Sequence, residues 1–589
     1  MTYPRPRKLA IILMVCIIVS GCSHSTNQAP AAAAPEKISW PPQPVFTPVA
    51  ATPPSTPIPL PTRSVPATPQ WQKTPVSLPR INDAYQLPLR LPGPAIKTIA
   101  SDARLAQIKA KLNKWPTSAA YRQLAEQHVR LGNYAEAARA YHAEAGIYRR
   151  KGLLNAALVE ERKAARYDTT TGLFVDRDLV SKEVDALYSG APLEPIVGCY
   201  IGAFIDRDEQ LKQTYFDENW QTHRRPQEFT RHIGKPHASY FMYLRYGQKF
   251  PRKWIQNLKA ANAIPHIAWE PRSLHSVQNN AYLHNFAKAC RAMDWPIFIR
   301  FAGEMNGDWT PYHGNPKPYR EKFRLVHRVL HKYAPRIATI WCVNSVPVQN
   351  IQQYYPGDDG CDWVGVNVYS VPYYDNDRRR PAFRDNVLSL IDPVYNLYAR
   401  KKPIAICEYA ASHMAAVDRV RRNDFAIDQL LMLYGALPRF YPRIKMIGWF
   451  SMNNLRYART GRQLNNYNLT EQPAILENYR RAVSSAYFLG APERLSNPRP
   501  QVPRPIASSQ RLHGATRFSS WVKTYVSRPK VYFAIDSEII YASSRPGVHM
   551  VDLDLNGVAP GDRKLTLYVY DDRGRFVTST TQTIIVEHW

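Results

Sequence analysis

The chain has 589 residues, of which 45% are hydrophobic, and a formal net charge of +30 at pH 7. This length exceeds one ordinary domain, and the apolar content suffices for a large buried core, which excludes a chain that is disordered throughout. Such a basic excess suits an acidic polysaccharide, anionic lipid headgroups or nucleic acid, although scattered charges also fit an ordinary solvated surface.

Residues 1–22 have the pattern of a secretory signal, in which basic residues precede a short apolar run. The Val-Ser-Gly-Cys motif that ends at Cys22 resembles the bacterial lipoprotein box, which implies cleavage before Cys22 and lipidation of its thiol. A signal cleaved elsewhere, or an uncleaved anchor, is the alternative. We therefore expect a lipid-anchored protein of the cell envelope, facing the periplasm or the surface, and Ser23 favours the outer membrane over the inner one. Export argues against nucleic acid as a partner.

Two contrasting segments follow. Residues 23–98 are dominated by Pro, Ala, Thr, Ser and Gln, which cannot bury enough apolar surface to fold, so we interpret them as a disordered tether. Helical signals replace proline in residues 99–190, where residues 124–141 resemble one tetratricopeptide repeat and Gly132 and Gly152 would separate helices. Arrays of this kind usually need three or more units, so the region is either a helical hairpin packed on the next domain or a groove for a protein partner.

Residues 191–495 alternate short apolar runs with amphipathic helical patterns, which is typical of βα units around a parallel sheet. The eight apolar runs are residues 196–205, 237–244, 264–269, 297–301, 337–343, 363–369, 404–407 and 446–450. We therefore predict an α/β fold, a (β/α)₈ TIM barrel, whose active site lies at the C-terminal ends of its strands. Residues 496–589 alternate apolar and polar positions between turn residues and are predicted to form a small β-sandwich.

Seven cysteines occur in the sequence. Cys16 would leave with the signal and Cys22 would carry lipid. The remaining five are Cys199, Cys290, Cys342, Cys361 and Cys407. Five is an odd number and three of these lie within apolar strand patterns, so we expect buried thiols rather than disulfides. No cysteine spacing suggests a metal site.

Two glutamates follow predicted strands: Glu304 comes after the fourth apolar run and Glu408 after the seventh. Hydrolysis of a glycosidic bond needs one carboxyl group to protonate the leaving oxygen and a second to attack or to activate water. Both glutamates would lie at the catalytic end of the barrel. A carboxylate that only pairs with arginine or with solvent is the alternative. Two carboxyl groups and water suffice for this reaction, so no metal or organic cofactor is implied.

Three segments in the same order resemble glycoside hydrolase family 26, a family of retaining (β/α)₈ enzymes known for β-mannanases. They are Ile-Pro-His-Ile-Ala-Trp-Glu-Pro at 264–271, Glu-Met-Asn-Gly-Asp-Trp at 304–309, and the stretch from Tyr-Pro-Gly-Asp at 355–358 to Asp-Trp-Val-Gly-Val-Asn-Val-Tyr at 362–369. The resemblance implies that Glu304 is the general acid/base, that Glu408 is the nucleophile and that Tyr369 orients Glu408. It also implies retention through a glycosyl-enzyme intermediate, with the carboxyl groups about 5 to 5.5 Å apart.

Substrate contacts are expected from aromatic and polar residues near strand ends, because sugar rings present flat C–H faces to aromatic platforms. The predicted substrate-binding residues are Trp269, Trp309, Tyr312, Asn344 and Trp449. Arg300 is expected to support the carboxylates. Gly303 stands where the family usually has histidine, and glycine has no side chain to donate to a substrate but leaves space for a differently shaped sugar.

The predicted function is a retaining endo-β-glycanase that acts on mannan-like or exopolysaccharide β-glycan by double displacement. The alternative is a non-catalytic lipoprotein that binds polysaccharide and acts as an export scaffold, with residues 99–190 recruiting a protein partner. An aldolase or isomerase barrel is disfavoured, because no glycine-rich phosphate loop follows the last two apolar runs and no lysine lies at those strand ends.

Overall fold

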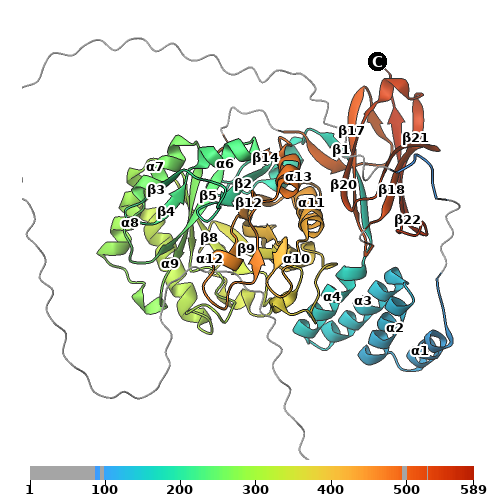
Figure 1. Ribbon diagram of the computed structural model, residues 1–589, viewed down its shortest axis with the longest axis horizontal. Coiled ribbons are helices and arrows are strands. Elements are labelled where there is room, and N and C mark those ends of the chain that lie inside the picture. The colour runs from blue at the N-terminus through green and yellow to red at the C-terminus, as the bar shows by residue number, and fades with distance from the viewer. Residues whose placement is uncertain (1–86, 93–98, 494–499, 527, 589) are drawn as a thin grey trace, which may run out of the picture. The chain divides into compact units, whose positions relative to one another are not determined.

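The computed structural model describes residues 87–92, 99–493, 500–526 and 528–588 (Figure 1). The predicted signal, Cys22 and most of the predicted tether lie outside these residues. Within the described part of the chain, no helix is both long and apolar enough to cross a membrane.

Four helices form the first folded region: α1 (Ala103–Lys114), α2 (Ser118–Arg130), α3 (Tyr134–Arg150) and α4 (Leu154–Tyr167). Each contacts its neighbour in sequence, and buried alanines such as Ala125 and Ala164 allow the close approach. Gly132 and Gly152 adopt positive φ angles of 74° and 70° at the turns after α2 and α3, as predicted for residues that separate helices. A short helix, α5 (Ser181–Leu187), precedes the barrel.

Eight parallel strands close into a barrel, since the last pairs with the first. They are β2 (Cys199–Phe204), β5 (Ser239–Arg245), β6 (Ile264–Glu270), β7 (Ile297–Phe301), β8 (Ile337–Asn344), β9 (Trp363–Ser370), β10 (Ile404–Ala411) and β12 (Ile444–Phe450). All eight predicted apolar runs are therefore strands, and the predicted (β/α)₈ fold is confirmed. The short strand β14 (Phe488–Leu489) pairs with β2 from outside.

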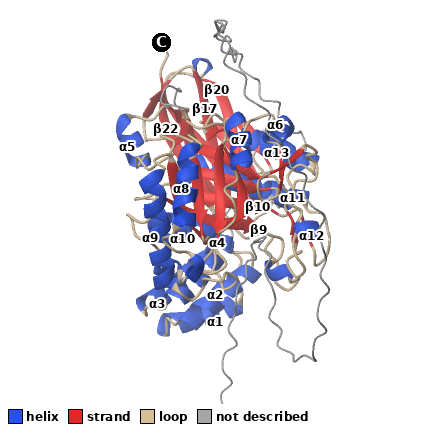
Figure 2. Cartoon of the chain, turned by 90° about the vertical axis from the view of Figure 1, so that its left-hand side faces the viewer, coloured by secondary structure: helices blue, strands red, loops and turns tan. Residues whose placement is uncertain are grey.

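Helices surround the barrel strands, as Figure 2 shows. They are α6 (Pro226–Ile233), α7 (Arg252–Ala260), α8 (Ala281–Ala292), α9 (Pro316–Tyr333), α10 (Leu388–Tyr398), α11 (Asn423–Phe440), α12 (Asn454–Tyr457) and α13 (Pro473–Val483). The loops add the hairpin of β3 (Thr214–Phe216) and β4 (Thr222–Arg224) and the pair of β11 (Met414–Ala415) and β13 (Asn465–Asn466).

Alternation along each strand divides the buried residues of the barrel into two sets. One set fills the interior, and its members include Tyr200, Ile264, Phe298, Ile340, Cys342, Cys407 and Met446. The other set packs against the helices. All five predicted thiols are buried and unbonded, which confirms the expectation of free cysteines.

A two-sheet domain follows the barrel. Its five-stranded sheet contains β16 (Gln510–Leu512), β18 (Lys530–Ile535), β19 (Glu538–Ser543), β21 (Gly561–Tyr570) and β22 (Phe576–Val586). Its four-stranded sheet has the order β15 (Val502–Pro505), β1 (Thr170–Arg177), β17 (Ala515–Lys523) and β20 (Gly547–Asp554).

Strand β1 corrects the predicted domain division, because it lies within the predicted helical region 99–190 yet belongs to the C-terminal sheet. It pairs antiparallel with both β15 and β17, so that Phe174 lies opposite Pro505 and Ser519. Leu173 and Val175 enter the sandwich core, whereas Phe174 contacts Phe440 of α11 edge-on at 5.5 Å. The sandwich is therefore built from two segments that are separated by the whole barrel.

Candidate active site

Glu408 enters the barrel interior because β10 contains a bulge. Ile406 pairs with Val366 and Glu408 pairs with Asn367, so Cys407 is the extra residue on β10. Cys407 already faces the interior, and strict alternation would turn the next side chain towards the helices. The bulge instead aims Glu408 inward as well, which is a known use of bulges near functional sites.

Three donors from three other strands hold both carboxylate oxygens of Glu408. The Tyr243 hydroxyl donates to Oε1 at 2.7 Å, and the Arg300 guanidinium pairs with the same oxygen at 2.6 Å. The Tyr369 hydroxyl donates to Oε2 at 2.6 Å, as the sequence analysis expected for this tyrosine. Glu408 and Arg300 are each only 1% exposed, so this is a buried ion pair whose charge is compensated by hydrogen bonds.

Glu304 lies just beyond β7 with a φ angle of 59°, a left-handed conformation that is uncommon for a residue with a side chain. Its Oε1 accepts hydrogen bonds from the side-chain amides of Asn344 at 3.0 Å and Asn367 at 2.8 Å. Its Oε2 accepts from the Trp309 indole at 2.9 Å. Such a strained backbone persists only where its surroundings hold it, and these three donors fix the carboxyl group in place.

Glu304 is protonated far more readily than an ordinary glutamate. Burial is the main cause and the negative charge of Glu408 is the second, and together they raise the pKa of Glu304 from 4.5 to about 7. The three hydrogen bonds from Asn367, Asn344 and Trp309 oppose this rise only in part, because they stabilise the ionised form.

Asn367 and Arg300 connect the two glutamates. Asn367 donates to Glu304 through Nδ2 and accepts from Arg300 Nη1 at 3.2 Å through Oδ1. The other arm of Arg300 binds Glu408. One carboxyl group therefore titrates near neutral pH beside a second that is bound to a cation and two hydroxyls, which is the division that acid and nucleophile require.

Trp309 lies at the site with part of its surface exposed, as does Tyr243. Its ring lies over Gly307, where a Cβ atom would overlap the indole. Asn344 is fully buried and contacts Glu304 directly, so both predicted residues lie at the carboxylate pair.

Tyr312 stands behind the site rather than in it, since it is 1% exposed. Its hydroxyl lies 2.6 Å from Glu270 Oε2 and 2.8 Å from the carbonyl oxygen of Gly303. Glu270 is a third buried carboxyl group at this end of the barrel, and burial raises its pKa. A Cβ atom on Gly303 would lie 3.4 Å from Glu270 Oε1, at ordinary van der Waals contact with that carboxyl group.

Two predicted platforms are wrong, because Trp269 and Trp449 lie on the outer face of their strands. Trp269 stacks on Phe286 of α8 with ring centroids 3.9 Å apart and is 0% exposed. Trp449 packs edge-on against Tyr479 of α13 at 5.5 Å and donates to the carbonyl of Tyr467. Both tryptophans fill the layer between barrel and helices and cannot contact a substrate.

Tyr243, Asn367 and Glu270 are site residues that the sequence analysis did not select. Each lies on an inward position near the C-terminal end of a strand, and Glu270 stands directly after Trp269. Alternation of side chains along each predicted strand indicates which residues point into the barrel, and this rule could have identified all three.

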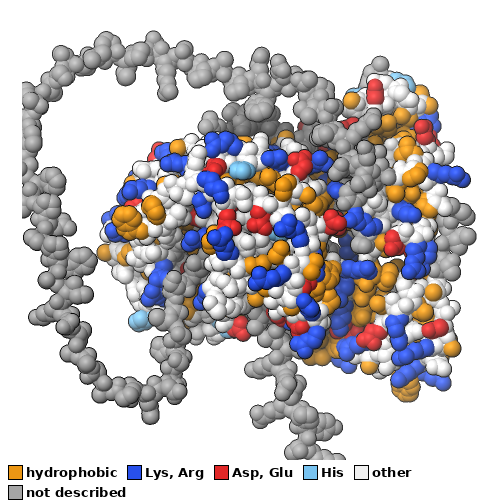
Figure 3. Space-filling model, viewed as in Figure 1, with side chains coloured by type: hydrophobic (Ala, Val, Ile, Leu, Met, Phe, Trp, Pro, Cys, Tyr) orange, Lys and Arg blue, Asp and Glu red, His pale blue; other side chains and the backbone are white. Residues whose placement is uncertain are grey.

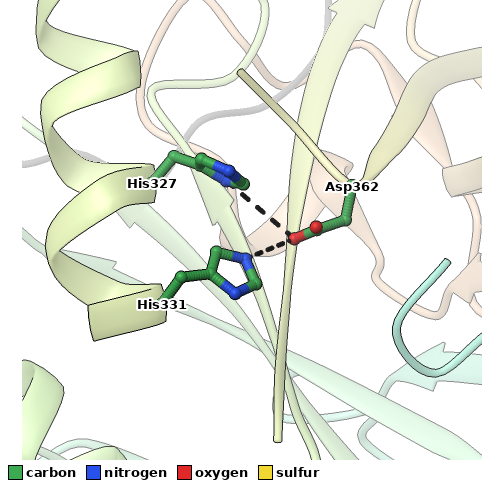
Figure 4. A group of neighbouring side chains, drawn as sticks. All are labelled: His327, His331 and Asp362. Atoms are coloured by element: carbon green, nitrogen blue, oxygen red, sulfur yellow. Dashed lines mark hydrogen bonds and ion pairs between the residues drawn. The ribbon is translucent and has the colours of Figure 1, made fainter. Parts of the chain in front are cut away.

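A separate group of metal-ligand type lies away from these carboxylates: His327 and His331, one turn apart on α9, face Asp362 at the start of β9 (Figure 4). His331 Nε2 lies 2.8 Å from Asp362 Oδ2, which also accepts from the backbone and hydroxyl of Thr339. One oxygen thus already has three donors. The group anchors α9 to the N-terminal ends of β8 and β9, where barrel residues serve stability.

Comparison with known proteins finds a family model that matches part of the barrel. Residues 253–394 match the family model described as Glycosyl hydrolase family 26, and this segment includes Glu270 and Glu304. The chain is 27% identical over 155 residues to a β-1,3-xylanase from Alcaligenes sp, covering 25% of this chain and 30% of that protein. It is 29% identical over 107 residues to a β-1,3-xylanase from Vibrio sp, covering 17% and 23% respectively. The chain thus spans less than a third of these curated relatives.

Among solved structures, an endo-β-1,4-mannanase from Cellulomonas fimi aligns with 69% of this chain and 98% of its own, at 15% identity and a TM-score of 0.39. A β-mannanase from Bacteroides ovatus aligns with 51% and 94%, at 13% identity and a TM-score of 0.35. The family match lies within the barrel, includes Glu304 and ends before Glu408, so this part of the chain is similar to glycosyl hydrolase family 26.

Proposed function

We propose that this protein is a retaining endo-β-glycanase in which Glu304 and Glu408 carry out the two chemical roles. The observation that supports this most strongly is the contrast between them: Glu304 has a pKa of about 7, whereas Glu408 is held by Arg300 and two tyrosine hydroxyls. One is suited to give a proton and the other to attack.

In the first step of the proposed mechanism, Glu304 protonates the leaving glycosidic oxygen while a Glu408 oxygen attacks the anomeric carbon. The C–O bond to the leaving group breaks as the glycosyl-enzyme ester forms. In the second step, ionised Glu304 takes a proton from water, which displaces Glu408 from the anomeric carbon. Two inversions give net retention, and Glu304 ends each cycle protonated.

The surrounding residues have supporting roles in this proposal. Tyr243, Tyr369 and Arg300 orient Glu408 and stabilise its charge. Trp309 positions Glu304 through its indole N–H and offers the exposed part of its ring to a sugar. Asn367, placed between the two carboxyl groups, couples their orientations.

The proposed substrate is a mannan-like or exopolysaccharide β-glycan. Gly303 has no side chain, and its backbone N–H lies 3.4 Å from Oε1 of the buried Glu270, so this position offers no side-chain donor to a substrate. The relatives named β-1,3-xylanases make xylan a necessary test substrate. The net charge of +30 suits an acidic polymer.

We also propose that lipidation of Cys22 anchors the protein to the cell envelope, with residues 23–98 as a tether and the helical region as a possible binding surface for a protein partner. Radiolabelled palmitate incorporation that is lost in Cys22→Ala would support the anchor. Equal incorporation in that variant would contradict it.

The decisive experiment measures reducing ends released by the full chain from β-1,4-mannan, β-1,3-xylan, β-glucans and acidic exopolysaccharides. Glu304→Ala and Glu408→Ala should both abolish release, and exposed Glu321→Ala on α9 is the matched control. Proton NMR of the first product should show a retained anomeric configuration. An inverted product would refute the mechanism, and binding without cleavage by the parent chain would favour the scaffold alternative.

A further inference from the structure

An exposed aromatic pair rises from the catalytic end of the barrel. The β3–β4 hairpin lies between the C-terminal end of β2 and helix α6, so it stands at the same end as Glu304 and Glu408. Trp220 at its tip is 82% exposed and Phe216 is 52% exposed, with ring centroids 6.3 Å apart. Figure 3, drawn in the same view as Figure 1, shows hydrophobic side chains at the surface in the region where Figure 1 labels β3 and β4.

The hairpin turn holds Trp220 in a conformation that the residue would not adopt unaided. Trp220 has a φ angle of 58°, a left-handed region that residues with a side chain rarely adopt. Asp217 fixes the turn, since its Oδ1 accepts from the backbone N–H groups of Asn219 at 2.8 Å and Gln221 at 2.9 Å. The indole is therefore displayed on a defined turn.

Polar contacts, some of them buried, anchor this turn to the barrel. His223 of β4 is 0% exposed and lies between Asp206 at 2.7 Å and Asp217 at 3.4 Å. Burial alone would lower the pKa of His223, but the two carboxylates outweigh it and raise the pKa to about 9. Asn219 exchanges two hydrogen bonds with the backbone of Lys249, in the loop after β5. A preorganised platform loses little entropy when a ligand binds.

We propose that Trp220 and Phe216 form a glycan-binding platform for pyranose units of the polymer that lie outside the units in contact with the carboxylates. This rests on the proposed function, because only a chain of several sugars extends from the carboxylates towards the rim. The flat C–H face of a pyranose matches an exposed indole, and the hairpin lies on the end of the barrel where such a chain enters. The platform would raise the affinity for long oligosaccharides over short ones, and would distinguish one sugar from another less strongly.

The test uses calorimetric binding to the full chain that carries Glu408→Ala, which prevents turnover in the proposed mechanism. The probes are the hexasaccharides and disaccharides of β-1,4-mannan, β-1,3-xylan and β-1,4-glucan. Trp220→Ala should weaken binding of the preferred hexasaccharide by about three- to tenfold and leave the disaccharide unchanged. Trp220→Tyr should restore most of the affinity. Trp115→Ala is the matched control, since Trp115 is 68% exposed in the helical region.

The outcomes separate this proposal from the proposed function. Equal hexasaccharide affinity with and without the Trp220 indole would overturn the platform, whatever the hydrolysis results. If hexasaccharide affinity depends on Trp220 but the parent chain cleaves none of the polymers, the platform is supported and the proposed glycanase activity is refuted. Failure of every hexasaccharide to bind would overturn the platform as stated.

Discussion

Glu304→Gln tests whether burial keeps the Glu304 carboxyl group protonated near neutral pH. The pKa of Glu304 rises from 4.5 to about 7 on folding, so the folded state binds this proton more tightly than the unfolded chain does. The resulting destabilisation is small below pH 4.5, grows as the pH rises and is complete above pH 7. Neutral glutamine avoids it at every pH.

The expected size follows from that difference of between two and three pH units. At about 1.4 kcal/mol per unit, the carboxyl group destabilises the fold by about 3 kcal/mol at pH 8.5 and by only about 1 kcal/mol at pH 5. Glutamine keeps an acceptor for the two asparagines, but its amide nitrogen cannot accept from Trp309, which costs about 1 kcal/mol at both pH values. Glu304→Gln should therefore be neutral at pH 5 and stabilising by about 2 kcal/mol at pH 8.5.

Scanning calorimetry of the full chain at the two pH values measures this difference. Each kcal/mol moves the Tm of a large domain by roughly 2–4 °C, so the barrel transition should rise by roughly 4–8 °C at pH 8.5 and stay nearly fixed at pH 5. Exposed Glu321→Gln controls for the loss of a negative charge alone. An equal Tm shift at both pH values would show that Glu304 titrates alike in the folded and unfolded chain, and would refute the reasoning.

Three further predictions concern catalysis by the same pair. The value of kcat/KM should fall above about pH 7, where Glu304 loses its proton. In Trp309→Phe this fall should begin at higher pH, because the indole N–H that is lost stabilises the ionised form of Glu304. Tyr369→Phe should lower kcat/KM about 10- to 100-fold, since one short hydrogen bond to charged Glu408 is lost; an unchanged rate would remove its orienting role. Gly307→Ala should displace the Trp309 ring and reduce the initial rate at least tenfold, and wild-type activity would contradict the observed contact.

Regular features of the chain could be predicted from the sequence, because local patterns determine them. The eight apolar runs located the strands, and the strand ends located Glu304 and Glu408. Whether an individual side chain points into the barrel or towards the helices was harder to predict. Trp269 and Trp449 follow the alternation that sends them towards the helices, and applying that rule strand by strand would have excluded both.

Other features depend on contacts between distant segments, which no local pattern reveals. The bulge that turns Glu408 inward arises from its pairing with β9, and the sequence around Cys407 gives no sign of it. The donor set of Glu408 comes from β5, β7 and β9, so Tyr243 becomes relevant only once the barrel closes. Strand β1 was missed for the same reason, because its partners lie on the far side of the barrel in sequence.

The position of β1 has a consequence for biosynthesis. More than 300 residues separate the end of β1 at Arg177 from the start of β17 at Ala515, which at 5–20 residues per second is a delay of roughly 15–70 s on the ribosome. During that delay β1 exposes an unpaired edge with the apolar residues Leu173 and Val175, while the barrel can already fold. A chain that stops before Ala515 keeps this edge permanently. Strand β1 can therefore be paired on both edges only after β17 has been synthesised.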